Sequence, residues 1–234
     1  IGEDAFYNCI NLTTINVPLS LEVLSYNIFG GCKKLTAFNI PENIKRIEGC
    51  AFYNCSGLKT LVIGKNVEYI GSYAFVGCNS LKEIKIPDSV TVFGDGTLTS
   101  KEESIWFGNN KSLQKIILGA GITKIPDYAF DGCVNLNSIV MSDNVTEIGR
   151  FAFRDCTSMA SIKLSSSLKT IGDEAFGNCQ KITVIELPDT IESLGNFVFA
   201  ECSSLTKVVL HKSLTNIGQW IFSYCDSEII VEYD

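Results

Sequence analysis

Phenylalanine recurs every 23 residues along almost the whole chain, and this period restricts the fold more than any other feature. The Phe column has one wider gap, between its fourth and fifth members: Phe6, Phe29, Phe52, Phe75, Phe107, Phe130, Phe153, Phe176, Phe199 and Phe222. Cys follows three residues later in nine repeats, and Asn110 takes that place in the fifth. Self-similarity with a period of about 20–50 residues is typical of stacked-repeat proteins. The sequence therefore predicts a solenoid of about ten repeats in a single domain, residues 1–234.

Each repeat combines a strand pattern with a compact turn. Residues 81–86 alternate apolar and polar side chains, which predicts a strand that shows one face to a core. A Pro or Gly then turns the chain. In Ala-Phe-x-x-Cys segments such as 74–78, Ala and Cys are four residues apart, which favours a short helical turn with its apolar groups directed inward. Because one coil cannot bury these groups alone, stacked coils with Phe, Cys and Leu ladders are expected. The expected class is an α/β repeat solenoid.

The repeat resembles that of the BspA-type leucine-rich-repeat family, whose unit reads approximately I-G-x-x-A-F-x-x-C-x-x-L-x-x-I-x-I-P. Residues 70–81, Ile-Gly-Ser-Tyr-Ala-Phe-Val-Gly-Cys-Asn-Ser-Leu, match every defined position of its first half. The resemblance covers essentially the whole chain and implies a right-handed superhelix with a parallel sheet on one face. It also implies a bacterial surface or secreted protein, with some members in parasitic protists, that adheres to host or neighbouring-cell proteins.

Composition excludes several classes of function. The net charge of −7 argues against nucleic acid as a partner, because phosphate binding requires clustered Lys and Arg. No apolar run approaches the roughly 18 residues of a membrane span, so membrane insertion is not expected. The chain opens at Ile1 without Met or a leader, so a signal peptide is expected to have been trimmed from this stretch, with an extracellular or cell-surface location.

Three interpretations compete for the Cys column: disulfides, a metal site and buried packing. Neighbouring coils hold equivalent Cβ atoms near ~5 Å, beyond the ~3.5–4.5 Å that a disulfide prefers. A straight row of thiols does not converge on a metal, and the chain has one His. Packing is favoured, since free Cys behaves as a small hydrophobe, and Asn110 suits a site where a backbone group is hydrogen-bonded. Cys50 lies outside the column and is the candidate for a reactive thiol, against the alternative of a half-buried bystander.

No catalytic, cofactor or metal site is expected. His211 is the only His, so any triad would have to use it, and it stands in the turn column where other repeats place Pro or Gly. The carboxylates show no paired pattern. The sequence predicts a protein that is not an enzyme and carries no cofactor.

The expected binding surface is the outward face of the strands, which is free to vary because the inward columns carry the fold. A protein or glycan is the expected ligand, with an ordinary solvated face as the alternative, and the oligomeric state is unknown. The candidate partner-binding residues lie in two adjacent columns: Val62, Lys85, Lys115, Ile117, Val140, Lys163, Glu186 and Val209. Ile117 beside Val140 should form an aliphatic spot with Lys115 and Lys163 at its edges. A structural spacer without a ligand is the competing function.

Two further features are expected at the surface. An aromatic stripe two residues before the Phe column could form a contact strip, or it could shield neighbouring coils on the convex side: Tyr73, Ile105, Tyr128, Phe151, Phe197 and Trp220. The fifth repeat contains an irregular insertion at about 95–104. Insertions in solenoids emerge as loops, and either a binding role or a neutral loop is open.

Overall fold

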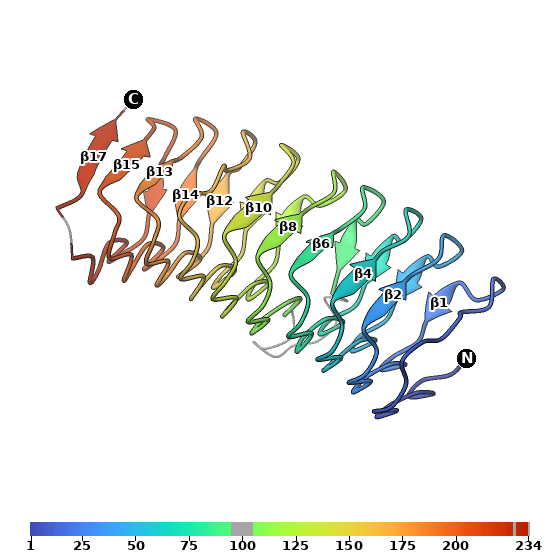
Figure 1. The fold of residues 1–234 in the computed structure, drawn as a ribbon. Coiled ribbons are helices and arrows are strands. Elements are labelled where there is room, and N and C mark those ends of the chain that lie inside the picture. Colours follow the sequence, from blue (N-terminus) through green and yellow to red (C-terminus); the bar gives the residue numbers. More distant parts are fainter. Residues whose placement is uncertain (95–104, 227, 234) are drawn as a thin grey trace.

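The computed structural model describes residues 1–94, 105–226 and 228–233, and it shows an elongated stack of coils (Figure 1). The chain makes about nine turns, and every ladder between neighbouring coils is parallel. The expected insertion at 95–104 lies outside the described residues. Among the described residues the core forms one continuous apolar cluster from Leu24 to Leu210.

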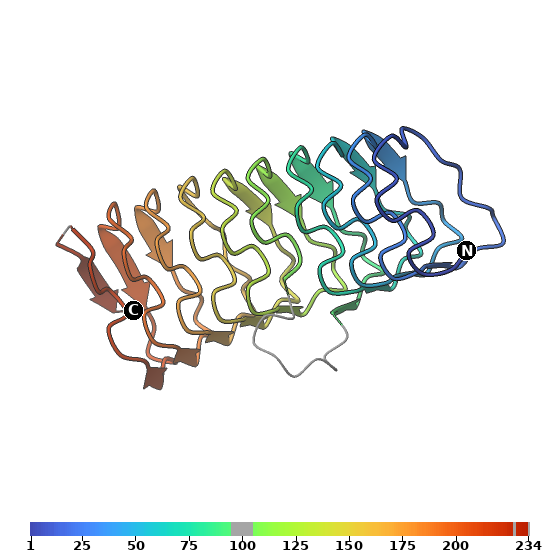
Figure 2. The ribbon, with the colours of Figure 1, turned by 90° about the horizontal axis from the view of Figure 1, so that it is seen from below.

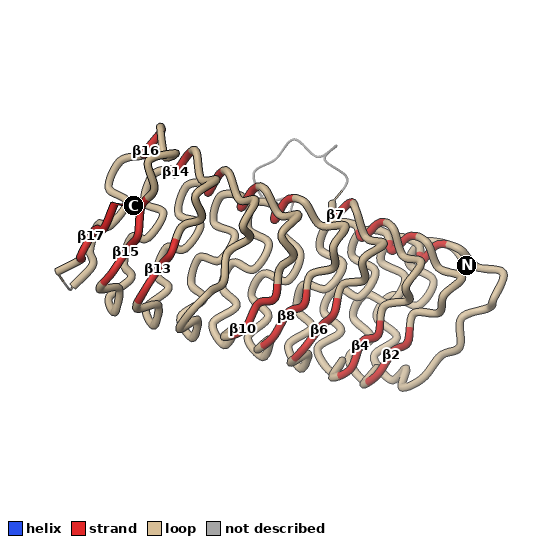
Figure 3. Tube along the Cα trace, turned by 90° about the horizontal axis from the view of Figure 1, so that it is seen from above, coloured by secondary structure: helices blue, strands red, loops and turns tan. Residues whose placement is uncertain are grey.

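Two rows of strands run along the solenoid on different sides, where a sheet on one face was expected (Figure 2, Figure 3). The long-strand row consists of β2 (Ala37–Asn39), β4 (Thr60–Val62), β6 (Glu83–Lys85), β8 (Lys115–Ile117), β10 (Ser138–Val140), β13 (Val184–Glu186), β15 (Lys207–Leu210) and β17 (Ile230–Tyr233). The short-strand row consists of β1 (Val23–Leu24), β3 (Arg46–Ile47), β5 (Tyr69–Ile70), β7 (Val92–Phe93), β9 (Lys124–Ile125), β11 (Glu147–Ile148), β12 (Thr170–Ile171), β14 (Ser193–Leu194) and β16 (Asn216–Ile217).

Neither row forms one unbroken sheet. The long-strand row pairs as β2-β4, β6-β8-β10 and β13-β15-β17, and the short-strand row pairs as β1-β3-β5-β7 and β9-β11-β12-β14-β16. In the long strands a buried residue lies between outward neighbours, as in the exposed-buried-exposed pattern of β4 and β6. The period-two strand prediction is confirmed at these positions.

The expected helical turns are wrong, and so is the α/β class, because the described residues contain no helix. The linking segment of a coil runs from a short strand to the next long strand, as residues 48–59 do between β3 and β4. In this segment φ is +57° at Cys50 and +55° at Asn54, whereas a right-handed helix needs φ near −63° throughout. The N–H of Tyr53 donates to the Cys50 carbonyl three residues back, but the N–H of Phe52 donates to Ala74 of the next coil. These bonds between coils replace those within a helix, so the fold is a parallel β solenoid.

The Phe ladder closes the core at this linking segment. Ring centroids of successive Phe side chains from Phe6 to Phe222 lie between 5.2 and 6.0 Å apart, within the range that aromatic pairs prefer. Phe29, Phe153 and the other interior members are fully buried. The predicted stacking of coils through this column is therefore confirmed.

Candidate functional site

The long-strand face, which we define as the outward side of the long-strand row, carries the eight residues singled out from the sequence. Val62 is 52% exposed and Val140 is 50% exposed, whereas Lys115, Ile117 and Val209 are half-buried. The remaining three, Lys85, Lys163 and Glu186, are exposed. Sequence periodicity therefore located the outward positions correctly, although their role in binding is untested.

Strand pairing brings some of these residues together and leaves others apart. Ile117 is paired with Lys85 on one side and with Val140 on the other. The aliphatic spot of Ile117 and Val140 therefore exists as neighbouring positions on adjacent coils. Lys163 belongs to no strand, and β4 with Val62 is not laddered to β6 with Lys85. Figure 3 shows β6, β8 and β10 side by side in the middle of the row.

Ion pairs between coils reduce the free charge of the long-strand face. Lys115 Nζ lies 2.9 Å from Glu83 Oε1 on the preceding coil, and Lys207 Nζ lies 2.8 Å from Glu232 Oε2 on the following coil. Exposed pairs of this kind contribute about 0–1 kcal/mol, so a charged ligand can displace them. Lys115, which was expected at the edge of the aliphatic spot, is therefore ion-paired with Glu83.

A hollow of about 520 Å³ opens beside Val62, at the place where β4 and β6 are not laddered. Three consecutive apolar residues of one coil, the turn residues Pro87–Ser89 of the next coil and two lysines line it: Leu61, Val62, Ile63, Lys65, Lys85, Pro87, Asp88 and Ser89. It lies within the size range of sites for small ligands or side-chain anchors. Sequence reasoning named Val62 and Lys85 without foreseeing this hollow, because the repeat pattern at this step is the same as at laddered steps.

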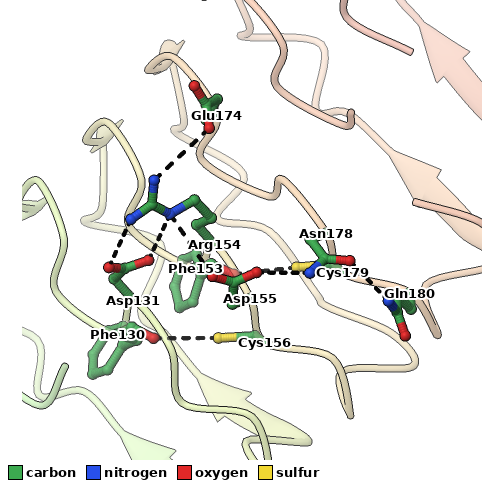
Figure 4. A network of polar contacts seen from close by, with 10 residues as sticks. All are labelled: Phe130, Asp131, Phe153, Arg154, Asp155, Cys156, Glu174, Asn178, Cys179 and Gln180. Carbon is green, nitrogen blue, oxygen red and sulfur yellow. Dashed lines mark hydrogen bonds and ion pairs between the residues drawn. The ribbon is translucent and has the colours of Figure 1, made fainter. Parts of the chain in front are cut away.

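A polar network on the linking segment was missed by the sequence reasoning (Figure 4). Arg154 Nε lies 2.8 Å from Asp131 Oδ1 on the preceding coil, and Arg154 Nη1 lies 4.0 Å from Glu174 Oε2 on the following coil. The hydrogen bond to Asp131 raises the pKa of Arg154, and its guanidinium lies 4.6 Å from the Phe151 ring centroid. Opposite charges 23 residues apart, as in Asp131 and Arg154, were the available signal. The network joins three coils.

The aromatic stripe lies on the same segment, and its side chains pack against neighbouring coils. Tyr128 and Phe151 stack with ring centroids 4.7 Å apart, and Phe197 and Trp220 stack at 5.2 Å. Backbone φ is +56° to +59° at Tyr128, Phe151 and Phe197, a conformation that is unusual for bulky residues. These contacts favour the shielding interpretation of the stripe over a contact strip.

The Cys column has a more specific role than apolar packing. All ten cysteines are free thiols, and each column thiol from Cys32 to Cys225 donates to the carbonyl of a Phe on the preceding coil. The distance from Cys156 Sγ to the Phe130 oxygen is 3.4 Å. Asn110 Nδ2 makes the equivalent bond to Phe75 at 3.1 Å, as its place in the column suggested. The column therefore supplies one hydrogen-bond donor per coil.

The environment of the thiols opposes their use as nucleophiles or ligands. Burial raises the pKa of Cys55, Cys133 and Cys202 to about 12, so these thiols stay protonated at neutral pH. Burial also raises the pKa of the candidate reactive thiol, Cys50, and a hydrogen bond with Tyr26 partly opposes that shift. Cys50 thus fits a half-buried bystander better than a reactive group.

Searches for a metal site and a membrane span gave no candidates in the described part of the chain. No group of three or more His, Cys, Asp or Glu side chains is placed to hold a metal ion within residues 1–94, 105–226 and 228–233. In the same residues, no helix has the length and apolar character needed to cross a membrane.

Comparison with known structures gives relatives of the same fold. A leucine-rich repeat protein from Bacteroides ovatus is 29% identical with a TM-score of 0.75 over 100% of this chain, which spans 63% of that protein's length. The T. pallidum leucine-rich repeat protein is 26% identical with a TM-score of 0.59, over 68% of this chain and 70% of its own. A leucine-rich cell surface protein from Faecalibacterium prausnitzii is 25% identical with a TM-score of 0.53, over 100% of this chain and 69% of its own.

Comparison with family models agrees with the repeat pattern. No curated protein matches the chain. The model described as "BspA type Leucine rich repeat region (6 copies)" matches residues 1–103 and 103–228, which together cover nearly all of the chain. Leucine-rich-repeat solenoids are typically non-catalytic, and no enzyme family is indicated. This chain belongs to the BspA-type leucine-rich repeat family.

Proposed function

We propose that this chain is a non-catalytic binding and adhesion region of a larger exported or cell-surface protein, and that it contacts a protein or glycan through the long-strand face. The observation that carries the proposal is the exposure of aliphatic side chains on that face. Val140 is 50% exposed and lies next to half-buried Ile117 on the neighbouring strand. Exposed aliphatic groups gathered on one face are typical of interaction surfaces.

The location follows from the relatives. The family is typically surface-associated, and the Faecalibacterium prausnitzii relative is described as a cell surface protein. We extend that location to this chain. An extracellular protein or glycan is the expected partner there, and nucleic acid is not expected because the chain carries a net charge of −7.

A structural spacer is the competing function, and the ion pairs between coils favour it. Ion pairs join neighbouring coils along the solenoid, and they form without a ligand: Lys45–Glu22, Lys65–Glu42 and Lys169–Glu192. A spacer needs a stiff body and no defined contact surface. The aliphatic spot at Ile117 and Val140 is the feature that a spacer does not require.

A binding screen against purified extracellular-matrix proteins and host glycans tests the proposal. The Ile117→Asp/Val140→Asp double variant would be screened beside the unmodified chain. The matched control is Val92→Asp/Ile217→Asp, which places the same two substitutions on the short-strand row at residues that are 46% and 48% exposed. Circular dichroism would check that both variants remain folded.

The three possible results separate the two functions. A ligand that is lost in Ile117→Asp/Val140→Asp and retained in the control supports binding through the long-strand face. A ligand that both variants retain would contradict that surface. Binding to nothing in the array would favour the spacer.

A further inference from the structure

The step from β4 to β6 differs from its neighbours along the long-strand row. At the steps on either side of it the N–H after the strand donates to the outward residue of the next coil: Ile40 to Val62, Ile86 to Ile117 and Leu118 to Val140, each at 2.8 Å. Among the described residues the two steps at the coil of Lys163, which has no strand at that position, lack this bond as well. Among the described residues, no such bond joins the N–H of Ile63 to the carbonyl of Lys85. On the short-strand row the same two coils stay paired through β5 and β7. The two coils are therefore laddered on the short-strand row but not between β4 and β6.

The hollow of about 520 Å³ lies at this unladdered step, with backbone groups at its edge. Leu61 and Ile63 are 5% and 8% exposed, and Pro87 is buried, so the floor is apolar while Val62 stands at the rim. Buried backbone donors normally have a partner. The N–H of Ile63 and the carbonyl of Lys85 are a donor and an acceptor that the neighbouring coil does not satisfy.

Two lysines and one carboxylate line this hollow. The carboxylate is that of Asp88, whose Oδ1 accepts a hydrogen bond from the N–H of Ala120 at 2.8 Å. Three other hollows, of about 370, 420 and 480 Å³, are each lined by more carboxylates than Lys and Arg side chains. Lys65 is ion-paired with Glu42 at 3.0 Å, so Lys85 supplies the cation beside the apolar floor.

We propose that the hollow between β4 and β6 binds an acidic peptide segment of a partner protein, with one aliphatic or aromatic side chain on Leu61, Val62 and Pro87. A carboxylate next to that side chain pairs with Lys85. Lys65 forms a second ion pair with the peptide when it gives up its exposed ion pair with Glu42. The proposal rests on the proposed function, because it names the partner chemistry of the same face.

The observations favour a peptide over a glycan. The floor offers apolar contact, which a branched or aromatic side chain uses fully and a sugar uses in part. Lys85 adds a cation that pairs with a carboxylate, which a peptide carries in Asp or Glu and a neutral sugar lacks.

An array of short synthetic peptides tests the inference on the whole chain. Each peptide has a central Phe, Leu or Ser flanked by Asp, Asn or Lys, and a glycan array is probed in parallel. The protein variants are Val62→Asp and Lys85→Glu. The matched control is Val92→Asp, the same substitution at similar exposure (46% against 52% for Val62), on the short-strand row and outside the hollow.

We expect the chain to prefer Asp-flanked peptides with central Phe or Leu. Val62→Asp and Lys85→Glu should each weaken this binding by about tenfold, whereas Val92→Asp should change it by less than about twofold. Equal binding of Asp-flanked and Lys-flanked peptides would overturn the inference, as would equal losses in Val62→Asp and Val92→Asp. Glycan binding that depends on Val62, without peptide binding, would also overturn it.

The two proposals fail in different ways. If a matrix ligand is lost in Ile117→Asp/Val140→Asp and no peptide depends on Val62, the long-strand face binds a partner but the hollow is not the site. If peptide binding depends on Val62 and Lys85 while the matrix and glycan screen is empty, the hollow binds peptides and the role of Ile117 and Val140 is contradicted.

Discussion

The Phe and Cys columns and the long-strand face share the same 23-residue spacing but differ in uniformity. Inside, the interior Phe rings are buried at nearly constant spacing, and each column thiol makes the same bond to the preceding coil. Outside, the equivalent positions hold Val62, Lys85, Ile117 and Val140, with different charge and exposure. The uniform columns specify the stacking of coils, and the variable positions are where recognition can differ without loss of the fold.

The largest expected effect is loss of the fold at high pH. The thiols of Cys55, Cys133 and Cys202 have pKa values raised from 9.0 to about 12, so folding favours their protonated form. Their stabilisation is complete below pH 9 and is lost as pH rises from about 9 to 12, by about 1.4 kcal/mol per pH unit for each thiol. Urea denaturation at about pH 8 and pH 10 measures the fall in the free energy of unfolding. In a Cys133→Ala/Cys202→Ala variant that fall should be smaller. An equal fall would contradict the attribution of the pH dependence to these thiols.

Removal of one ring from the Phe ladder should give the next largest effect. Phe153 is fully buried, with Phe130 at 5.2 Å and Phe176 at 5.3 Å. Phe153→Ala should lower the free energy of unfolding by about 3–5 kcal/mol, because a cavity forms where neighbouring coils cannot close in. Urea denaturation measures the change. A loss below about 1 kcal/mol would show that the ladder does not carry the stacking.

Asn110 tests whether the Cys column acts as a row of donors. Asn110→Ala removes the bond to the Phe75 carbonyl and should cost about 1–3 kcal/mol. Asn110→Cys restores the donor found in the other coils, and it removes the Asn110 Oδ1, which is buried without a partner. It should therefore be less destabilising than Asn110→Ala in the same denaturation experiment. The reverse order would contradict the role of this column as a row of donors.

The smallest expected effect on stability is on the long-strand face. Val140→Asp should change the free energy of unfolding by less than about 0.5 kcal/mol, because the side chain is half exposed and makes no core contact that others cannot replace. The same denaturation series measures it beside Phe153→Ala. A change as large as that of a ladder residue would remove the distinction between the two regions.

Recognition of the repeat was enough to place the core and the outward positions. Phe, Cys and Leu at constant spacing had to face inward, because no other arrangement buries all repeats equally, and Val62 and Val140 then had to face outward. The ion pair of Arg154 with Asp131 followed from the same spacing but was overlooked. The hollow beside Val62 had no sequence signal, because Ile63 and Lys85 occupy the same columns as residues that are bonded at other steps.

The 23-residue period by itself determined that the chain forms a stack of coils with shared Phe and Cys ladders, since these groups can be buried only against their own copies. The tertiary structure decided the path between the ladders. Side chains as different as Cys50, Tyr73 and Glu174 take positive φ in one column, because bonds between coils and not residue preference set the backbone there. It also decided that β4 and β6 are not laddered, because strand pairing depends on the packing of whole turns, which no single column records.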